Sequence, residues 1–377
     1  IRSGNLTPWP PSRAGKGARG LGPSRGKKYM TTSNTEKLGI AIQGAGNVST
    51  EHLRAYLNNP HVEVVAIGSR TLEGAERKAR QVGLDPARVR LYDDYDALLS
   101  DRRVDALSLC TPPARHAEET IQGARAGKHL LIEKPVAMNL EELRAMDAAV
   151  RAGGVRTVVS FVLRWNPLVL TIKQMLADGF FGQVFFVQTA YWHNVVQGRY
   201  PGAKPGPRSS PVSTMLGGGC HAMDMARYLA GSDVDQVTAL SKDTTPGHAS
   251  PANTAALCRF SSGVMGYVSA CTEQWMPYVF NIELFGTDGA IRGNRFYSRK
   301  LSGATGFVEM PTVMPDSGDV AHHPFQGEID HFVDCILSGR ESHVNLADAV
   351  NTHEACFAAD RSAAHGGAPE PLPIEGT

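Results

Sequence analysis

The chain has 377 residues, with 42% hydrophobic and 20% charged side chains and a formal net charge of +1. Its length indicates about two domains, and no apolar run approaches the ~20 residues that a membrane helix needs. Residues 1–29 hold seven of the 38 basic residues and no acidic one. The rest of the chain therefore has 31 basic and 37 acidic residues and is mildly acidic. Nucleic-acid binding therefore has no support outside this segment.

Residues 1–36 are expected to form a disordered basic tail, because Gly and Pro recur there and apolar residues are scarce. A basic interaction arm is the alternative. Met30 and the residues after it are typical of a translation start, so the preceding segment is interpreted as upstream or cloning-derived sequence. Six cysteines without a CxxC pair, mostly in apolar or helical surroundings, indicate reduced core residues in a cytoplasmic protein: Cys110, Cys220, Cys258, Cys271, Cys335 and Cys356.

Short β-branched runs alternate with helical patterns from Lys37 to about Val159. This alternation predicts a doubly wound parallel sheet, an α/β Rossmann domain over 37–160. Strands are expected at 38–43, 62–67, 106–109, 130–132 and 157–159, with helices near 48–58, 71–82, 114–126 and 140–152.

Longer strand-like runs joined by short Gly-containing turns follow Gly182. Such turns connect antiparallel neighbours, so an α+β domain with a large, predominantly antiparallel sheet is predicted over 161–366. The Gly-, Pro- and Ser-rich loop 194–211 is a candidate lid, and 367–377 is expected to be a flexible tail. Strands are expected at 184–191, 255–260, 264–270, 280–285 and from 290 onward, with helices near 213–230, 325–338 and 346–364.

The first strand ends in a GxGxxG pattern whose third glycine is replaced by Ser49. Gly44 and Gly46 permit a tight turn, and Asn47 follows them where a helix begins, so main-chain N–H groups are positioned to bind a pyrophosphate. The pattern by itself is weak. Its place at the first strand–helix turn of a βαβ unit favours dinucleotide binding.

The second strand ends in Ser69 and Arg70, where an NAD-preferring fold commonly has an acidic residue. A hydroxyl and a guanidinium suit a 2′-phosphate, so NADP is favoured over NAD. The alternative is that Arg70 stacks on the adenine and serves either cofactor.

Two more strand ends carry candidate site residues. The strand 106–109 leads into Thr111-Pro112-Pro113, followed by His116 at a helix start, and this loop is expected to border the nicotinamide. The strand 130–132 runs into Glu133-Lys134-Pro135, which places Lys134 at the edge of the sheet where ligands bind. Because the pKa of a lysine shifts readily on desolvation, Lys134 is a candidate proton donor or acceptor, with an ordinary surface lysine as the alternative.

Between Lys37 and about Gly366 the chain resembles the Gfo/Idh/MocA oxidoreductases, named for glucose-fructose oxidoreductase and inositol dehydrogenase. The most specific signal is Gly-Lys-His-x-x-x-Glu-Lys-Pro at the end of a Rossmann strand. The matching motifs are Gly44-x-Gly46 with His52, Thr111-Pro112-Pro113 with His116, Ala126 to Pro135, Arg164-x-x-Pro167, the Gly286-Thr-Asp-Gly289 turn, Phe332-x-x-x-Ile336 and Ala347-Asp-Ala349.

The resemblance implies that Lys134 lies beside nicotinamide C4 and the reacting carbon–oxygen bond, and that Glu133 contacts the nicotinamide ribose. It also implies a second catalytic motif, Asp-x-Gly-x-His-x-x-Asp, in which His221 is retained and Gly217 replaces the first Asp. A histidine with a pKa close to neutral suits removal of a hydroxyl proton as hydride leaves the carbon. Asp224 is a candidate substitute for the missing carboxylate and a candidate substrate contact, with a structural hydrogen-bonding role as the alternative.

Further candidates lie where the family faces its ligands. Tyr191-Trp192-His193-Asn194 ends a strand of the second domain, and His193 and Asn194 are candidate contacts to substrate hydroxyls. The alternative for Tyr191 and Trp192 is a position in the core. Arg164 is a candidate cofactor contact and Trp165 a candidate substrate contact, with capping of the linker helix as the alternative. No metal is expected, because His193, Cys220, His221 and Asp224 follow no ligand spacing.

We therefore expect a cytoplasmic NAD(P)-dependent oxidoreductase that transfers a hydride between NADP or NAD and a secondary alcohol or ketone of a sugar, glycoside, cyclitol or related polyol. The resemblance further implies a homodimer or homotetramer that pairs through the open face of the second sheet, with no nucleic-acid or membrane partner. Two alternatives remain: an NAD-dependent glycosidase that acts through transient oxidation, and a nucleotide-binding regulator without catalytic activity.

Overall fold

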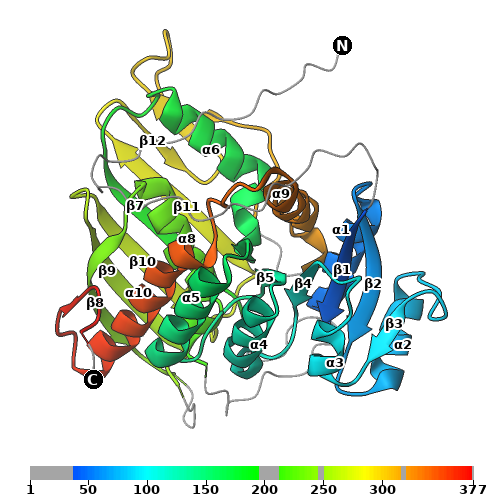
Figure 1. Ribbon diagram of the computed structural model, residues 1–377. Coiled ribbons are helices and arrows are strands. Elements are labelled where there is room, and N and C mark those ends of the chain that lie inside the picture. The colour runs from blue at the N-terminus through cyan, green and yellow to red at the C-terminus, as the bar shows by residue number, and fades with distance from the viewer. Residues whose placement is uncertain (1–36, 195–211, 245–249, 316–319, 376–377) are drawn as a thin grey trace, which may run out of the picture. The chain divides into compact units, whose positions relative to one another are not determined.

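The computed structural model describes residues 37–194, 212–244, 250–315 and 320–375. The expected basic tail and all of the candidate lid except Asn194 lie outside the described residues. Within them the chain builds two sheets, one of six strands and one of nine (Figure 1). No helix in these segments has the length and apolar content to span a membrane.

The six-stranded sheet confirms the predicted Rossmann domain. Its strand order is β3-β2-β1-β4-β5-β6, and every neighbouring pair is parallel. The chain crosses from one half of the sheet to the other between β3 and β4, so the carboxyl ends of β1 and β4 flank the crevice of the fold. The elements are β1 Leu38–Gln43, α1 Val48–Asn58, β2 Val62–Gly68, α2 Leu72–Gln81, β3 Arg90–Tyr92, α3 Tyr95–Leu99, β4 Ala106–Leu109, α4 Pro113–Arg125, β5 His129–Ile132, α5 Leu140–Gly153 and β6 Thr157–Val159.

Two of these elements, β3 and α3, were not predicted. β3 has only three residues and no buried one, so it lacks the apolar alternation that marks a strand. α3 has five residues and begins after Asp94, whose side chain accepts a hydrogen bond from the N–H of Ala97. Such short elements at a sheet edge depend on tertiary contacts more than on local pattern.

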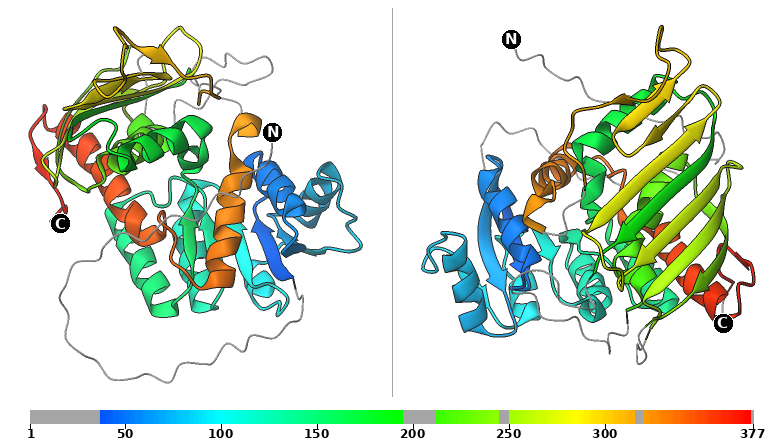
Figure 2. Two further views of the ribbon diagram at one scale, coloured as in Figure 1. Left: turned by 90° about the horizontal axis from the view of Figure 1, so that it is seen from above. Right: turned by 180° about the vertical axis from the view of Figure 1, so that it is seen from behind.

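The second sheet is mixed and mostly antiparallel, with the order β14-β13-β12-β11-β7-β10-β9-β8-β15. Only β7 and β10 pair in parallel among its described strands. Its helices gather on one face, and the other face carries no helix of the described chain (Figure 2). The strands are β7 Val184–Trp192, β8 Val234–Ser241, β9 Asn253–Phe260, β10 Met265–Cys271, β11 Val279–Gly286, β12 Gly289–Arg292, β13 Arg295–Ser298, β14 Val308–Glu309 and β15 Glu370–Pro371.

The helix expected near 213–230 is divided in two at Gly218. The backbone there bends (φ −114°, ψ −40°), and a Cβ on Gly218 would lie 2.1 Å from the ring of Tyr191. The break therefore lets Tyr191 pack against the start of the second helix. The helices of this half are η1 Val162–Trp165, α6 Pro167–Ala177, α7 Thr214–Gly217, α8 Gly219–Ala230, η2 Val320–His322, α9 Phe325–Ser338 and α10 Leu346–Ala364.

The segment expected to be a flexible tail, 367–377, is ordered in its described part, which corrects that prediction. Glu370 and Pro371 form β15 and pair with β8. Ile374 is 4% exposed, and its N–H donates to a carboxylate oxygen of Glu354 at 2.9 Å. A segment this short gives no periodic signal, so only the packing shows that it belongs to the sheet.

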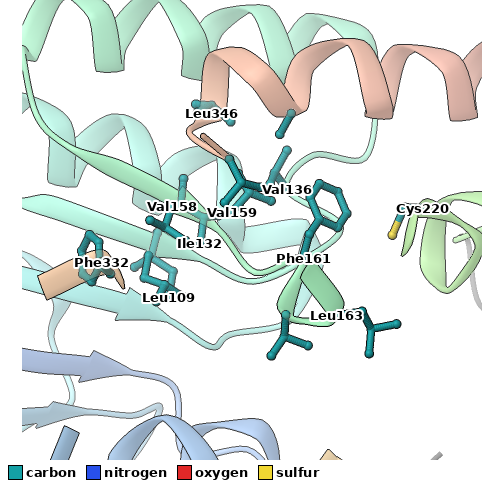
Figure 3. Packing of buried hydrophobic residues seen from close by; sticks show 14 of the residues in the cluster. Leu109, Ile132, Val136, Val158, Val159, Phe161, Leu163, Cys220, Phe332 and Leu346 are labelled. Carbon is teal, nitrogen blue, oxygen red and sulfur yellow. The ribbon is translucent and has the colours of Figure 1, made fainter. Parts of the chain in front are cut away.

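Buried side chains run without interruption from the first sheet to the second. Leu109, Ile132 and Val159 pack at the ends of β4, β5 and β6, and Phe161 continues this layer toward Cys220 of α8 (Figure 3). The carboxyl edge of the parallel sheet is therefore packed against the helix that carries His221.

Candidate active site

The glycine-rich turn after β1 leaves space at the start of α1. Gly44 has φ +104°, and a Cβ there would lie 2.6 Å from the carbonyl oxygen of Cys110, so the turn requires glycine. Gly46 and Asn47 are exposed, and the Asn47 side chain makes no capping hydrogen bond to the helix. The first N–H groups of α1 are thus accessible to an anion, which fits the pyrophosphate of a dinucleotide.

Ser69 and Arg70 follow β2, one strand from this turn. Ser69 is partly buried and donates its N–H to the carbonyl of Tyr92 at 2.9 Å, whereas Arg70 is exposed. Gln43 and Gly68 are paired in the parallel ladder, so both residues lie at the same sheet edge as the glycine-rich turn. Their contact with a cofactor ribose stays a prediction.

His116 connects two loops by hydrogen bonds at the carboxyl edge of the parallel sheet. Its Nε2 lies 2.8 Å from the carbonyl oxygen of Thr111 and its Nδ1 lies 2.9 Å from that of Pro135. The hydroxyl of Thr111 donates to Glu119 at 2.5 Å, which holds the loop from the other side. Pro112 precedes α4 as its N-cap residue. His116 therefore holds the two loops that shape the crevice, and it also lines the cavity described below.

Glu133 is held by a buried hydrogen-bonded chain. His52 donates from Nε2 to Glu133 at 3.0 Å, and its Nδ1 lies 3.2 Å from the hydroxyl of Ser108, which also contacts the hydroxyl of Tyr56 at 2.8 Å. Burial raises the pKa of Glu133, but the hydrogen bond and charge of His52 and the charge of Lys134 outweigh it and hold the pKa below its usual range. The sequence singled out His52 only as part of a motif. The structure makes it the residue that orients Glu133.

Lys134 extends from the end of β5 toward the second domain. Its ammonium donates to the carbonyl oxygen of Gly217 at 3.2 Å, and the peptide bond to Pro135 is cis. The side chain therefore bridges the parallel sheet and the end of α7.

Lys134 and His221 line the same cavity, which has a volume of about 290 Å³. Six of the predicted site residues meet there. Ser160, Tyr278 and His323 also line the cavity. They were not predicted, because they belong to no recognisable motif. The full lining is Val48, Thr111, His116, Glu133, Lys134, Ser160, Val162, Tyr191, His193, His221, Tyr278, His323 and Phe325.

His221 is a neutral imidazole in this setting. Burial, together with the nearby charge of Lys134 and of other histidines, holds the pKa of His221 well below its usual range. This corrects the expectation of a near-neutral pKa. Its Nδ1 is buried and has no hydrogen-bond partner among the described residues, and its ring stacks on Tyr191 at a centroid distance of 6.3 Å. As a neutral imidazole, His221 has one unprotonated ring nitrogen that can accept a hydrogen bond.

His193 and Asn194 have different surroundings. His193 lines the cavity, receives a contact from the Tyr191 hydroxyl at 2.9 Å, and has its pKa lowered to about 4 by burial and by the charge of Lys134. Asn194 is 4% exposed, donates its side-chain amide to the carbonyl of Gln274, and does not belong to the lining. The role of His193 as a substrate contact stays a prediction, whereas Asn194 makes a structural hydrogen bond outside the lining.

Arg164 and Asp224 do not lie in this cavity, which corrects their predicted contacts with cofactor and substrate. Arg164 donates to both carboxylate oxygens of Asp224, at 2.8 and 2.6 Å, and to Asp348 at 2.8 Å. Both members of the pair are at most 3% exposed. Each satisfies the other's charge, so neither is available to a ligand of the cavity.

Trp165 does not line the cavity either, which corrects its predicted contact with the substrate. Its ring packs against those of His331 and His343 at 5.4 and 5.5 Å, and it fills the space beside Gly327. It therefore belongs to the contact of η1 with α9, not to the cavity. No group of three or more His, Cys, Asp or Glu side chains in the described parts of the chain is placed to hold a metal ion.

Two family models match the chain. The Oxidoreductase family, NAD-binding Rossmann fold, covers residues 38–161, and the GFO/IDH/MocA C-terminal domain covers residues 169–292. Together they span the parallel sheet and the greater part of the second sheet.

Two inositol dehydrogenases and one solved structure match over nearly their full length. The scyllo-inositol 2-dehydrogenase (NAD(+)) of Bacillus subtilis is 24% identical over 338 residues, covering 86% of this chain and 94% of the relative. The inositol 2-dehydrogenase of Rhizobium meliloti is 27% identical over 335 residues, covering 86% and 96%. The structure of levoglucosan dehydrogenase with NADH and levoglucosan has the same fold, with a TM-score of 0.79 at 22% identity and coverage of 90% and 100%. The chain belongs to the Gfo/Idh/MocA family of oxidoreductases, and its first domain is an NAD-binding Rossmann domain.

Proposed function

We propose that this protein is an NAD(P)-dependent dehydrogenase that transfers a hydride between the nicotinamide and a secondary alcohol carbon of a sugar, cyclitol or related polyol. The observation that carries the proposal is the meeting of Lys134 and His221 in one cavity at the carboxyl edge of the NAD-binding sheet. The named activities of the inositol dehydrogenases support the same substrate class.

The oxidised cofactor, when bound, supplies the acceptor for the hydride. The chain's own residues then have two tasks: Lys134 places a positive charge beside the substrate oxygen, and the neutral His221 accepts the hydroxyl proton. The hydroxyl proton moves to His221 while the hydride leaves the carbon that bears this hydroxyl, so charge and electrons balance. Glu133, oriented by His52, fixes the position of the ribose.

The lining of the cavity is consistent with a hydroxylated ring. Tyr191 and Tyr278 lie with their rings 5.6 Å apart, and His193 and His323 add polar groups. Aromatic faces pack on the C–H faces of a sugar or cyclitol, while imidazoles exchange hydrogen bonds with its hydroxyls. A volume of about 290 Å³ fits one such ring.

The test is a screen of sugars, glycosides and inositols with NAD and with NADP, following the absorbance of the reduced nicotinamide. The expected result is reduction of the cofactor by at least one of these substrates. Net cleavage of a glycoside without accumulation of reduced cofactor would instead support the glycosidase. Cofactor binding with no turnover of any of them would contradict the dehydrogenase and favour a regulator.

NADP use alongside NAD is part of the proposal. It is supported by the exposed guanidinium of Arg70 and by the hydroxyl of Ser69 at the end of β2. The test compares the ratio of kcat/KM for NADP to that for NAD in the wild type and in Arg70→Ala. A charge-assisted contact to a 2′-phosphate predicts that the ratio falls roughly tenfold in the variant. An unchanged ratio would contradict it.

We infer that the protein forms a homodimer or homotetramer through the helix-free face of the second sheet. Leu257 of β9 and Met265 of β10 are 59% and 54% exposed there. Apolar side chains on an open sheet face are typical of a subunit interface. Light scattering should give a mass at least twice that of the chain, and Leu257→Glu should lower it.

We also propose a cytoplasmic location, which is supported by the six cysteines without disulfide bonds.

A further inference from the structure

A lysine on α2 reaches beneath the glycine-rich turn. Lys78 is 4% exposed, and its ammonium donates to the carbonyl oxygen of Gly46 at 2.8 Å and to the hydroxyl of Thr50 at 2.6 Å. The same carbonyl accepts the hydroxyl of Ser49 at 2.7 Å. Lys78 therefore fixes the last residue of the turn and the first turn of α1 at once.

This buried ammonium has no acidic partner at ion-pair distance among the described residues; its two acceptors are neutral oxygens. Lysine is almost never fully buried without a compensating negative charge, because desolvation penalises the cation. Burial lowers the pKa of Lys78, and the charges of Arg54 and Arg77 add to the effect, whereas the charge of Glu51 partly opposes it. An anion at the turn would relieve this cost.

We propose that Lys78 is a positioning residue for the dinucleotide, and that its ammonium supplies a buried positive charge behind the turn for the pyrophosphate. The inference rests on the NAD-binding function of the domain. The charge adds to the partial positive charge at the N-terminus of α1. Its hydrogen bond to Gly46 also keeps the turn in the shape that exposes the first N–H groups of the helix.

The contacts favour the pyrophosphate over the 2′-phosphate of NADP. Lys78 bonds to the turn after β1, where the pyrophosphate binds, whereas the 2′-phosphate is expected at Ser69 and Arg70 after β2. Both ligands are phosphates, so the experiment has to separate them. ADP carries a diphosphate and no 2′-phosphate, and adenosine 2′-monophosphate carries only the 2′-phosphate.

The experiment measures dissociation constants of the full-length protein by calorimetry for NAD, NADP, ADP and adenosine 2′-monophosphate. The variants are Lys78→Met and Lys78→Arg, with Lys128→Met as the matched control. Lys128 also donates to two main-chain carbonyls, those of Asp101 and Val104, but at the amino end of β5. Melting temperatures without ligand report whether each variant folds.

Lys78→Met is expected to bind NAD, NADP and ADP roughly tenfold more weakly, with a smaller salt dependence, and to bind adenosine 2′-monophosphate as the wild type does. Lys78→Arg, which keeps the charge, and Lys128→Met should stay within about threefold of the wild type. Equal ADP affinity in Lys78→Met and the wild type would overturn the inference. A loss confined to NADP and adenosine 2′-monophosphate would overturn it in favour of the 2′-phosphate. A wild type that binds neither NAD nor ADP would overturn the cofactor assignment itself.

Discussion

The ammonium of Lys134 lies 3.2 Å from the main-chain carbonyl oxygen of Gly217. This hydrogen bond joins the end of β5 to the end of α7, across the cavity that also contains His221. The acceptor is a neutral main-chain oxygen, and Gly217 has no side chain that could add a carboxylate. Residue 217 therefore offers no carboxylate to Lys134, and Nδ1 of His221 is without a hydrogen-bond partner among the described residues.

Removal of the Lys134 ammonium is expected to cost more activity than any other single change in the cavity. Lys134→Met should lower kcat by about 10²–10³-fold, because the group stabilises charge that develops on the substrate oxygen. Cofactor affinity should stay within about threefold, since the loss is confined to the reacting end. Steady-state kinetics and calorimetry separate the two effects. Lys300→Met is the control, because that side chain is exposed, pairs with Asp288 and does not line the cavity.

Gly217→Asp is expected to restore an acidic neighbour for His221. Residue 217 does not have a positive φ, and a Cβ there would meet only a methyl group of Val212 at 3.2 Å, so a side chain fits with a small adjustment. A carboxylate at the position of the first Asp in the family motif favours the charged imidazole of His221 and raises its pKa. The acidic limb of the kcat/KM profile, where the base becomes protonated, should shift upward by about one pH unit.

Gly217→Ala is the control for this experiment, because it adds the Cβ without the charge. Its pH profile should match that of the wild type. If Gly217→Ala and Gly217→Asp shifted the profile equally, the effect would be steric and the electrostatic account would be wrong.

The Arg164–Asp224 pair is expected to support the fold without taking part in binding. Arg164→Met leaves the carboxylate of Asp224 buried without its partner, so the free energy of unfolding should fall by about 3–5 kcal/mol. Urea denaturation measures this loss. The double variant Arg164→Met/Asp224→Leu should recover part of it, because no unpaired charge remains.

The exposed pair Arg259–Asp235, with an Nε–Oδ1 distance of 2.7 Å, provides the comparison. Arg259→Met should change stability by no more than about 1 kcal/mol. A tenfold rise in the KM for NAD in the folded Arg164→Met protein, beyond any change in stability, would restore Arg164 as a cofactor contact.

Glu328 on α9 is expected to make stability fall as pH rises. Its side chain is fully buried, its Oε2 accepts the hydroxyl of Ser160 at 3.0 Å, and burial raises its pKa well above the usual value of 4.5. Above pH 4.5 the unfolded chain has lost this proton while the folded protein keeps it, so protons are released on unfolding and stability decreases.

Glu328→Gln removes this titration and mimics the protonated carboxyl. The difference in the free energy of unfolding, variant minus wild type, should therefore increase as pH rises from 4 to 8. Urea denaturation at several pH values measures it. A difference that does not vary with pH would show that Glu328 keeps an ordinary pKa in the folded protein.

Local pattern accounted for most of the fold. The β1 and β4 boundaries follow from mostly apolar runs that end before Gly44 and Cys110, because a buried parallel strand is apolar along nearly its whole length. The same reasoning missed β3 and α3, which are short and lie at the edge of the sheet. The break between α7 and α8 was also not predicted, since the close approach of the Tyr191 ring to Gly218 is a contact between residues distant in sequence.

The sequence by itself determined the class of domain, the family motifs and the strand end that presents Lys134, because these depend on periodicity and on residues adjacent in the chain. Only the tertiary structure decided which of the candidates meet. It placed His221 in the cavity of Lys134, assigned Arg164 and Asp224 to each other, and showed His52 orienting Glu133. The physical reason is that a charged or polar side chain pairs with the partner that packing brings to it, and residues 60 to 87 positions apart acquire that partner only when the sheets and helices are assembled.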